Sequence, residues 1–200
     1  MQHGYNTLQP TVTRCRGLGL RLRLISAAAG LPILIAAIWF GTPWLTAVVG
    51  LVALLGIWEF ARLASGVGAR VPLPLAAVLT LALALHSELP PHDLDLLLPL
   101  VGGGAIVSGL WFLAAGQRRG LADWAFTVAG ALYVGLLLSH ALLLRQAAQG
   151  RDWLLFALLT TFAADTGAYF TGHLLGRRPL APTISPRKTQ EGAVGGLVWA

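Results

Sequence analysis

Long apolar runs alternate with short polar segments along most of the chain. A membrane-spanning helix needs about 20 mainly apolar residues, and six runs approach that length. They are Leu24–Phe40, Trp44–Phe60, Pro72–Leu85, Leu94–Ala115, Trp124–Leu144 and Trp153–Leu175. A seventh run, Gly192–Ala200, is too short to cross a bilayer as a helix. The pattern predicts an all-α polytopic membrane protein with about six transmembrane helices and the start of a seventh.

Composition supports this interpretation. Hydrophobic residues make up 56% of the chain and charged residues only 11%, whereas a soluble domain carries about 25% charged residues. The single cysteine, Cys15, excludes a disulfide framework and a cysteine-rich metal site. We expect a basic segment, residues 1–23, followed by one transmembrane domain, residues 24–200. Within it, Gly102–Gly104 is expected to let helices approach closely.

Basic residues are distributed unequally between the two sets of loops. Twelve of the 14 Lys and Arg residues lie in the N-terminal segment or in the loops after the second, fourth and sixth runs. The opposite loops hold only Arg145 and Arg151. Because Lys and Arg concentrate on the cytoplasmic side, the N terminus and the loop after Leu175 are expected to be cytoplasmic. This bias accounts for the net charge of +6 without nucleic acid as a partner.

Four ionisable side chains fall within the predicted spans: Glu59, His140, Asp165 and His173. Glu59 and His140 lie toward the ends of their spans, where we expect structural roles. Asp165 lies about halfway along its span, where an aspartate costs about 2.5–3.5 kcal/mol. A buried carboxylate stays charged only beside a cation, a basic side chain or water. The residues alone leave open a salt bridge or a functional site.

Asp165 shares one face of its helix with Tyr169 and three small residues. The three- and four-residue spacing adds Ala168, Gly172 and Gly176 to that face. One acid, one phenol and small residues together predict a polar cleft between helices.

The loop after this span adds cationic and hydroxyl side chains. Its cations are Arg177, Arg178, Arg187 and Lys188, and its hydroxyls include Ser185 and Thr189. Guanidinium and ammonium groups donate well to phosphate oxygens. Glu191 follows, and the glycines behind it are expected to let a helix begin close to a ligand. Together with Asp165, these groups indicate a site for Mg²⁺ and phosphates.

The stretch DTGAYFTGHLLGRRPLAPTISPRKTQEGAVGG, residues 165–196, closely resembles the phosphatidate cytidylyltransferases, also called CDP-diacylglycerol synthases. Members of that family carry DTxAYxxGRxFG, a short loop and ISPKKTxEGxxGG. The upstream WEF at 58–60 and YVG at 133–135 look similar as well. The chain departs from the pattern at His173, where Arg or Lys is usual, at Leu175 in place of Phe, and at Arg187 in place of Lys.

The resemblance implies a nucleotidyltransferase of phospholipid biosynthesis that converts CTP and phosphatidate to CDP-diacylglycerol and pyrophosphate with Mg²⁺ as cofactor. It implies an integral protein of the bacterial inner membrane with its site facing the cytoplasm, and it leaves a homodimer open. We expect Asp165 and Lys188 to be catalytic, with Asp165 also a metal ligand. The expected substrate-binding residues are Tyr169, Ser185, Arg187, Thr189 and Glu191.

The family's C-terminal signature, a Lys-Asp element followed by PGHGG and DRxD, has no counterpart before Ala200. The resemblance implies that the main metal-binding aspartates belong to that element, so these residues are expected to carry the family fold only in part. Three alternatives stay open: another CTP-dependent membrane lipid transferase or kinase, a truncated inactive homologue, and a transporter with Asp165 as a relay. A transporter predicts paired inverted halves, but the first half has no second DTGAY-like segment.

Overall fold

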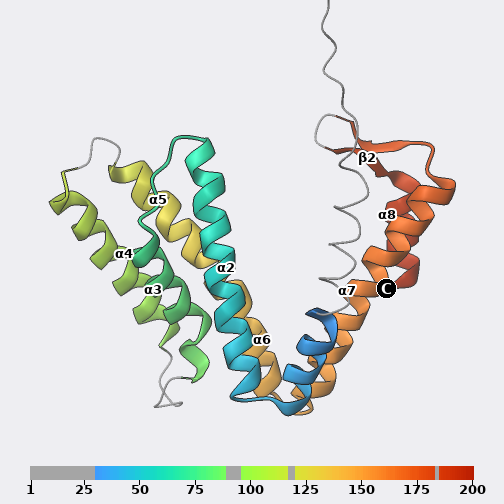
Figure 1. Ribbon diagram of the computed structural model, residues 1–200, viewed down its shortest axis with the longest axis horizontal. Helices are drawn as coiled ribbons and strands as arrows, with labels where there is room; N and C mark the ends of the chain where they lie inside the picture. The colour runs from blue at the N-terminus through green and yellow to red at the C-terminus, as the bar shows by residue number, and fades with distance from the viewer. Residues whose placement is uncertain (1–29, 89–95, 117–119, 183–184) are drawn as a thin grey trace, which may run out of the picture.

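The computed structural model describes residues 30–88, 96–116, 120–182 and 185–200. The predicted N-terminal segment, 1–23, and residues 24–29 lie outside the described residues. Two limbs diverge from a shared base (Figure 1). We call the limb built from α2 to α6 the bundle, and the limb built from α7, a β hairpin and α8 the arm.

The bundle follows the short helix Gly30–Phe40. Its elements are α2 (Trp44–Gly66), α3 (Leu73–Ala84), the 3₁₀ turn η1 (His86–Glu88), α4 (Leu97–Ala114), α5 (Gly120–Ala131), the π-helical turn η2 (Leu132–Leu136) and α6 (Leu137–Gln146). Because η2 continues α5 directly into α6, these three elements form one helical stretch, Gly120–Gln146.

The arm begins with α7 (Gly150–Leu175), which starts at the base and extends away from the bundle (Figure 1). The hairpin strands β1 (Pro179–Ala181) and β2 (Ser185–Thr189) pair antiparallel, with Pro179 opposite Thr189 and Ala181 opposite Ser185. Then α8 (Gln190–Trp199) packs back against α7.

The described part of the chain is mostly helical, and four of its helical stretches are long and apolar enough to cross a membrane. They are α2, α4, Gly120–Gln146 and α7. The fold is therefore that of an all-α membrane protein, as the sequence predicts. The predicted span Pro72–Leu85 is shorter in the structure, because the 12 residues of α3 reach about 18 Å, against a hydrocarbon core of about 30 Å.

The segment between α7 and α8, which the sequence predicted to be a loop, forms a hairpin instead. Three prolines obscure this from sequence, since proline cannot donate to a strand ladder and argues against a strand. Short edge-like strands tolerate them here: Pro179 begins β1, and Pro186 lies within β2 of a sheet that has only two strands.

Glycines bring helices together in the bundle, but at other positions than predicted. A Cβ at Gly135 in η2 would lie 2.5 Å from the Thr80 carbonyl oxygen of α3. By contrast, no described residue lies within 4 Å of a Cβ at Gly102 or Gly103, whereas Leu79 lies 3.0 Å from a Cβ at Gly104. The prediction of close packing at Gly102–Gly104 is therefore wrong for two of its three glycines, whose face of α4 is open.

The core that joins the two limbs lies at the base. Its buried members are Ala37, Ile38, Leu45, Val49, Ala53, Ala84 and Leu142. From α7, Leu154, Leu155 and Leu158 pack against them. Among the described residues, the bundle therefore packs on the first part of α7, and the rest of the arm is held by contacts among α7, the hairpin and α8.

Arg145 and Arg151, the two exceptions to the charge bias, both contact the short helix Gly30–Phe40. The Nε of Arg145 donates to the Ile38 carbonyl at 3.1 Å. The guanidinium of Arg151 lies over the Trp39 ring, 4.6 Å from its centroid. Cations near a helix C-terminus stabilise its unpaired carbonyls, so both residues have a structural reason for their position.

Most buried polar side chains described in the bundle have a hydrogen-bond partner, although Thr46 Oγ1 and Ser87 Oγ are buried without one among the described residues. Thr80 Oγ1 donates to the Ala76 carbonyl at 2.7 Å, and Thr127 Oγ1 donates to that of Asp123 at 2.7 Å. The Asp123 side chain is only 2% exposed, and its Oδ1 accepts the backbone N–H of Arg70 at 2.7 Å. Asp123 stands just before a predicted span, where an acid gives no signal of burial in the sequence.

Candidate functional site

The arm is held together by glycines rather than by large side chains. The residues of α8 that are buried are Gly192, Gly195 and Gly196. A Cβ at Gly192 would lie 2.9 Å from the Ala168 carbonyl oxygen and 3.1 Å from Gly172 Cα. The sequence predicted that these glycines bring the helix close to a ligand, whereas in the structure they bring it close to α7.

Thr189 and Glu191 fasten the hairpin to this helix pair. Thr189 is the N-cap of α8, and its Oγ1 accepts the N–H of Gly192 at 3.2 Å. The Oε2 of Glu191 accepts the backbone N–H groups of Arg177 and Arg178, at 3.1 and 3.2 Å. Both residues, predicted to bind substrate, therefore also have structural partners that hold the arginine pair at the end of α7.

Glu191 is stabilised in its charged form. Hydrogen bonds from backbone N–H groups, first its own and then those of Arg177 and Arg178, lower the pKa of Glu191 below its ordinary value of 4.5. The positive charge of Arg178 acts in the same direction, and partial desolvation opposes it. The carboxylate therefore remains ionised at neutral pH.

Asp165 and Tyr169 lie on α7 outside the contact with α8. Asp165 is exposed, and Tyr169 is 65% exposed. Of the face predicted to form a cleft, Ala168 and Gly172 are instead covered by α8. Leu158 packs on the base. Asp165 and Tyr169 follow it by seven and eleven residues, so the helical repeat places them on the same face of α7. Their face of α7 is thus the one that the bundle covers lower down.

His173 stands where the resembling family has a fixed cation. Its ring stacks parallel to that of Tyr169, with an interplanar angle of 1° and centroids 6.0 Å apart. Tyr169 also meets Phe170 edge to face. The substitution at His173 therefore extends an aromatic surface along α7 toward the hairpin.

The remaining predicted residues lie on the hairpin. Ser185 begins β2 and Lys188 lies near its end with an exposed side chain. Arg187 lies between them in the same strand. Asp165 precedes the end of α7 by ten residues, about 15 Å along the helix axis. The structure thus groups the hairpin residues at one end of the arm and leaves Asp165 in the span below them.

Neither the Asp165 carboxylate nor the Lys188 ammonium group has a hydrogen bond or ion pair within the described residues, where Arg151–Asp152 is the ion pair found. The same part of the chain has no cluster of three or more His, Cys, Asp or Glu side chains. Magnesium is commonly held by one or two carboxylates together with substrate phosphates. Asp165 fits a role as one such ligand, but these residues do not enclose a metal by themselves.

Sequence reasoning missed a groove along the seam between α7 and α8. Its volume is about 690 Å³. The side chains that line it are Thr171, Leu175, Arg177, Arg178, Gln190, Glu191, Val194, Gly195, Val198 and Trp199. Two features of the sequence could have indicated this groove. They are the adjacent arginines Arg177 and Arg178, and the apolar residues Val194 and Val198, which are four positions apart.

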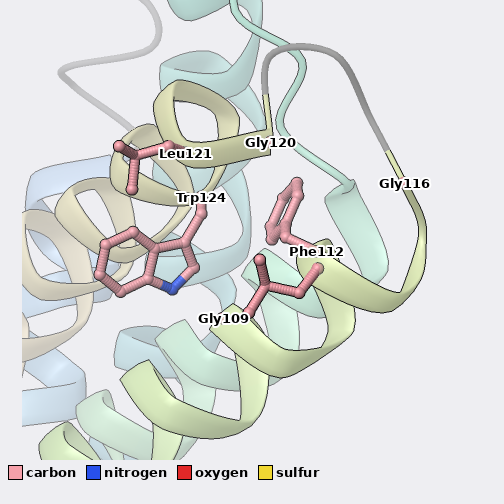
Figure 2. Close-up of a pocket in the computed structure, with 7 residues that line it drawn as sticks. Gly109, Phe112, Gly116, Gly120, Leu121 and Trp124 are labelled. Carbon is pink, nitrogen blue, oxygen red and sulfur yellow. The ribbon is translucent and has the colours of Figure 1, made fainter.

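A second cavity, of about 420 Å³, lies where α4 meets α5 (Figure 2). Trp124 lies over α4 beside Gly109, and its Nε1 donates to the Ala105 carbonyl and to Ser108 Oγ, both at 3.1 Å. Among the described residues that line this cavity, none carries an ionisable group. The described charged and hydroxyl groups that the sequence points to lie instead on the arm, which is therefore the candidate site.

Comparisons with known proteins show what this chain is similar to. A profile of the Cytidylyltransferase family matches residues 21–200. Proteins named phosphatidate cytidylyltransferase are similar over a shorter stretch. The one from Staphylococcus saprophyticus is 42% identical over 82 residues, 41% of this chain and 31% of the relative. The one from Bacillus subtilis is 40% identical over 76 residues, which are 38% of this chain. The one from Mycobacterium bovis is 38% identical over 78 residues, which are 39% of this chain. The aligned part covers 28% and 26% of these two relatives, so each match spans less than a third of the relative's length.

Proposed function

Because the chain belongs to the Cytidylyltransferase family, we propose that it catalyses transfer of the cytidylyl group from CTP to phosphatidate, giving CDP-diacylglycerol and pyrophosphate. The names of the relatives support phosphatidate as the acceptor. The chain belongs by this proposal to bacterial phospholipid biosynthesis, with CTP, phosphatidate and the bilayer as its partners. A homodimer stays a prediction.

One structural observation carries the proposal: Asp165 and Lys188 are exposed and unpaired within the described chain, while their neighbours are engaged. Keeping an unpaired acid in a span is costly, which suits a residue reserved for a ligand. Thr189 and Glu191, by contrast, hold the hairpin in place. The arm therefore combines a fixed frame with two free charges.

The chemistry requires neutralisation of negative charge. A phosphate oxygen of the lipid attacks the α-phosphorus of CTP, the bond to the β-phosphate oxygen breaks, and pyrophosphate leaves. Positioned cations stabilise the charge that spreads over the phosphate oxygens. We assign this role to Lys188 and Arg187 on β2, with the Ser185 hydroxyl as a further donor.

The other predicted residues have supporting roles in this proposal. The Thr189 hydroxyl still has its O–H to donate, since its oxygen accepts from Gly192. Glu191 positions Arg177 and Arg178, and Tyr169 offers a phenol and a ring surface on α7. Asp165 is proposed to act in catalysis as a ligand of Mg²⁺, whose contribution when bound is to neutralise phosphate charge.

We also propose about six transmembrane segments with the N terminus and the site on the cytoplasmic side of the inner membrane. The charge bias supports this orientation. The C-terminal end of α2, which leads into the loop with Arg70, lies at the same end of the molecule as the hairpin (Figure 1). Cytosolic CTP would then reach Lys188 directly, and the lipid would arrive from the bilayer.

A transfer assay with several acceptors tests the proposed function. The protein, purified in detergent micelles, is given Mg²⁺ and CTP labelled at the α-phosphate, with phosphatidate, polyprenol or an unsaturated ether-lipid phosphate. We expect label in the lipid fraction with phosphatidate and release of one pyrophosphate per product. Labelling only with another acceptor would replace phosphatidate by that lipid. A parallel reaction uses CTP labelled at the γ-phosphate; label in the lipid fraction from that reaction would identify a kinase and overturn the proposal.

A further inference from the structure

The groove along the α7–α8 seam has one polar end and one apolar wall. Arg177 and Arg178 lie at the hairpin end, and both side chains are exposed. The wall is formed by Leu175 together with the α8 residues Val194, Val198 and Trp199, which are all more than half exposed. A water-soluble ligand has no use for such a wall, whereas an amphiphile matches both parts.

The arginine pair is prepared for an anion. Neither guanidinium takes part in an ion pair within the described residues. The backbone at both positions is held by the Glu191 carboxylate, at 3.1 and 3.2 Å. The Glu191 oxygen that makes these bonds accepts from backbone N–H groups and not from the guanidinium groups. Two guanidinium groups and one carboxylate therefore give this end of the groove a net positive charge. Guanidinium groups bind phosphate oxygens through paired hydrogen bonds.

The apolar wall runs along α8 away from the arginines. Val194 and Val198 follow one another on the same face of α8, and Trp199 is the next residue after Val198. A chain of methylene groups beginning below the arginines would therefore follow this wall.

We propose that this groove is the docking site of an anionic phospholipid, with its phosphate at Arg177 and Arg178 and one acyl chain along Val194, Val198 and Trp199. The inference rests on the proposed function only in treating that lipid as the acceptor. It separates two sets of cations: Arg177 and Arg178 bind the lipid phosphate, and Lys188 with Arg187 binds the nucleotide. Arg177 and Arg178 are positioning residues for the lipid.

Native mass spectrometry of the protein in detergent, without CTP, tests the docking site. Dioleoyl phosphatidate is titrated against dioleoyl phosphatidylcholine and glycerol 3-phosphate. We expect preferential binding of phosphatidate, a loss of affinity of about tenfold or more in the double variant Arg177→Gln/Arg178→Gln, and no binding of glycerol 3-phosphate. Val194→Trp, which fills the groove without changing its charge, should weaken binding as well. The matched control is Arg62→Gln/Arg70→Gln, which removes two exposed arginines, one near the end of α2 and one in the segment that follows it.

The outcomes separate this proposal from the proposed function. Phosphatidate binding that is the same in the wild type and in both groove variants would overturn the docking site, even if CTP-dependent transfer is intact. Equal binding of glycerol 3-phosphate would show a phosphate site without a lipid site and would also overturn it. Groove-dependent lipid binding without cytidylyl transfer would support the docking site and contradict the proposed function. With transfer active, the arginine variant should raise KM for phosphatidate and leave KM for CTP unchanged.

Discussion

The bundle and the arm solve the problem of polar groups in a membrane protein in opposite ways. In the bundle, buried hydroxyls such as Thr80 donate to their own helix, and Asp123 accepts the Arg70 N–H. In the arm, the packed surfaces are glycines, and the acid Asp165 and the cation Lys188 are left exposed. A satisfied polar group stabilises a fold, whereas an unsatisfied one is available to a ligand. This difference is the basis of our proposal that the bundle is the support and that the arm carries the site.

Enlarging a glycine at a seam should have the largest effect on stability. Gly135→Val would push a side chain into the Thr80 carbonyl, 2.5 Å from the Cβ position, in the bundle. Overpacking of this kind costs about 1–3 kcal/mol, so we expect a lower midpoint of thermal unfolding in detergent. Gly192→Val should instead detach α8 from α7 and increase tryptic cleavage after Arg177, with little effect on the bundle.

One control comes from each limb: Gly103 from α4 of the bundle and Ala193 from α8 of the arm. Gly103→Ala, where nothing lies within 4 Å of the added Cβ, should leave stability unchanged or raise it slightly, because alanine favours helix. Ala193→Val lies beside Gly192 on an exposed position of α8. If these controls destabilise the protein as much as the seam variants, close packing at the glycines is not the cause.

The two acids, Asp123 and Asp165, provide the sharpest test of the division between the limbs. Asp123→Leu leaves the Arg70 N–H without its acceptor and should cost about 1–3 kcal/mol of stability. Asp165→Asn loses a charge that no described residue pairs with, so it should keep the unfolding midpoint of the wild type. Its rate of cytidylyl transfer, however, should fall by about 100-fold. Thermal unfolding and transfer rates measured on both variants check this; a destabilised Asp165→Asn with normal turnover would reverse the assignment.

The surroundings of Asp165 show most clearly how much of the site can be predicted from the sequence. The helical repeat places Asp165 and Tyr169 on one face, and the structure leaves both exposed there. The repeat cannot say which neighbour covers which part of a helix, so Gly172 was assigned to a cleft although α8 covers it. Prolines obscured the hairpin for a similar reason: propensity is local, while the pairing of Pro179 with Thr189 depends on α8 returning along α7.

The charge pattern shows the same limit. It separates twelve basic residues from two, but the reason for the exceptions is three-dimensional. Arg145 reaches the Ile38 carbonyl, 107 residues away in sequence. Likewise, the groove depends on Arg178 and Val198 lining one space, which no spacing rule predicts across a hairpin.

A weaker effect on stability is expected from pH at Glu191, which links α8 to the residues that follow α7. Because the folded-state pKa of Glu191 is lowered from 4.5, its contribution to stability is complete above the unfolded-state pKa. It is lost as the pH falls through the lower folded-state pKa. Hydrogen exchange should therefore show loss of protection of the Arg177 and Arg178 amides below about pH 4.5. Glu191→Gln, which cannot titrate, should show no such step; an identical pH dependence in that variant would assign the loss to another group.

The smallest effect is expected at the base. Arg151→Ala removes the cation over Trp39, a contact worth about 0.5–1 kcal/mol at an exposed site. The unfolding midpoint should fall slightly and cytidylyl transfer should be unchanged, because Arg151 lies at the opposite end of α7 from the hairpin. Loss of transfer in this variant would show that the base and the arm are coupled.

Lys188→Ala tests the central claim, that the arm performs cytidylyl transfer, most directly. The measurement is the rate of label transfer from CTP to phosphatidate, in protein whose unfolding midpoint matches that of the wild type, with Arg62→Ala as the control for loss of an exposed cation. We expect a decrease of about 100-fold or more for Lys188→Ala and a normal rate for the control. A normal rate in Lys188→Ala would contradict the account.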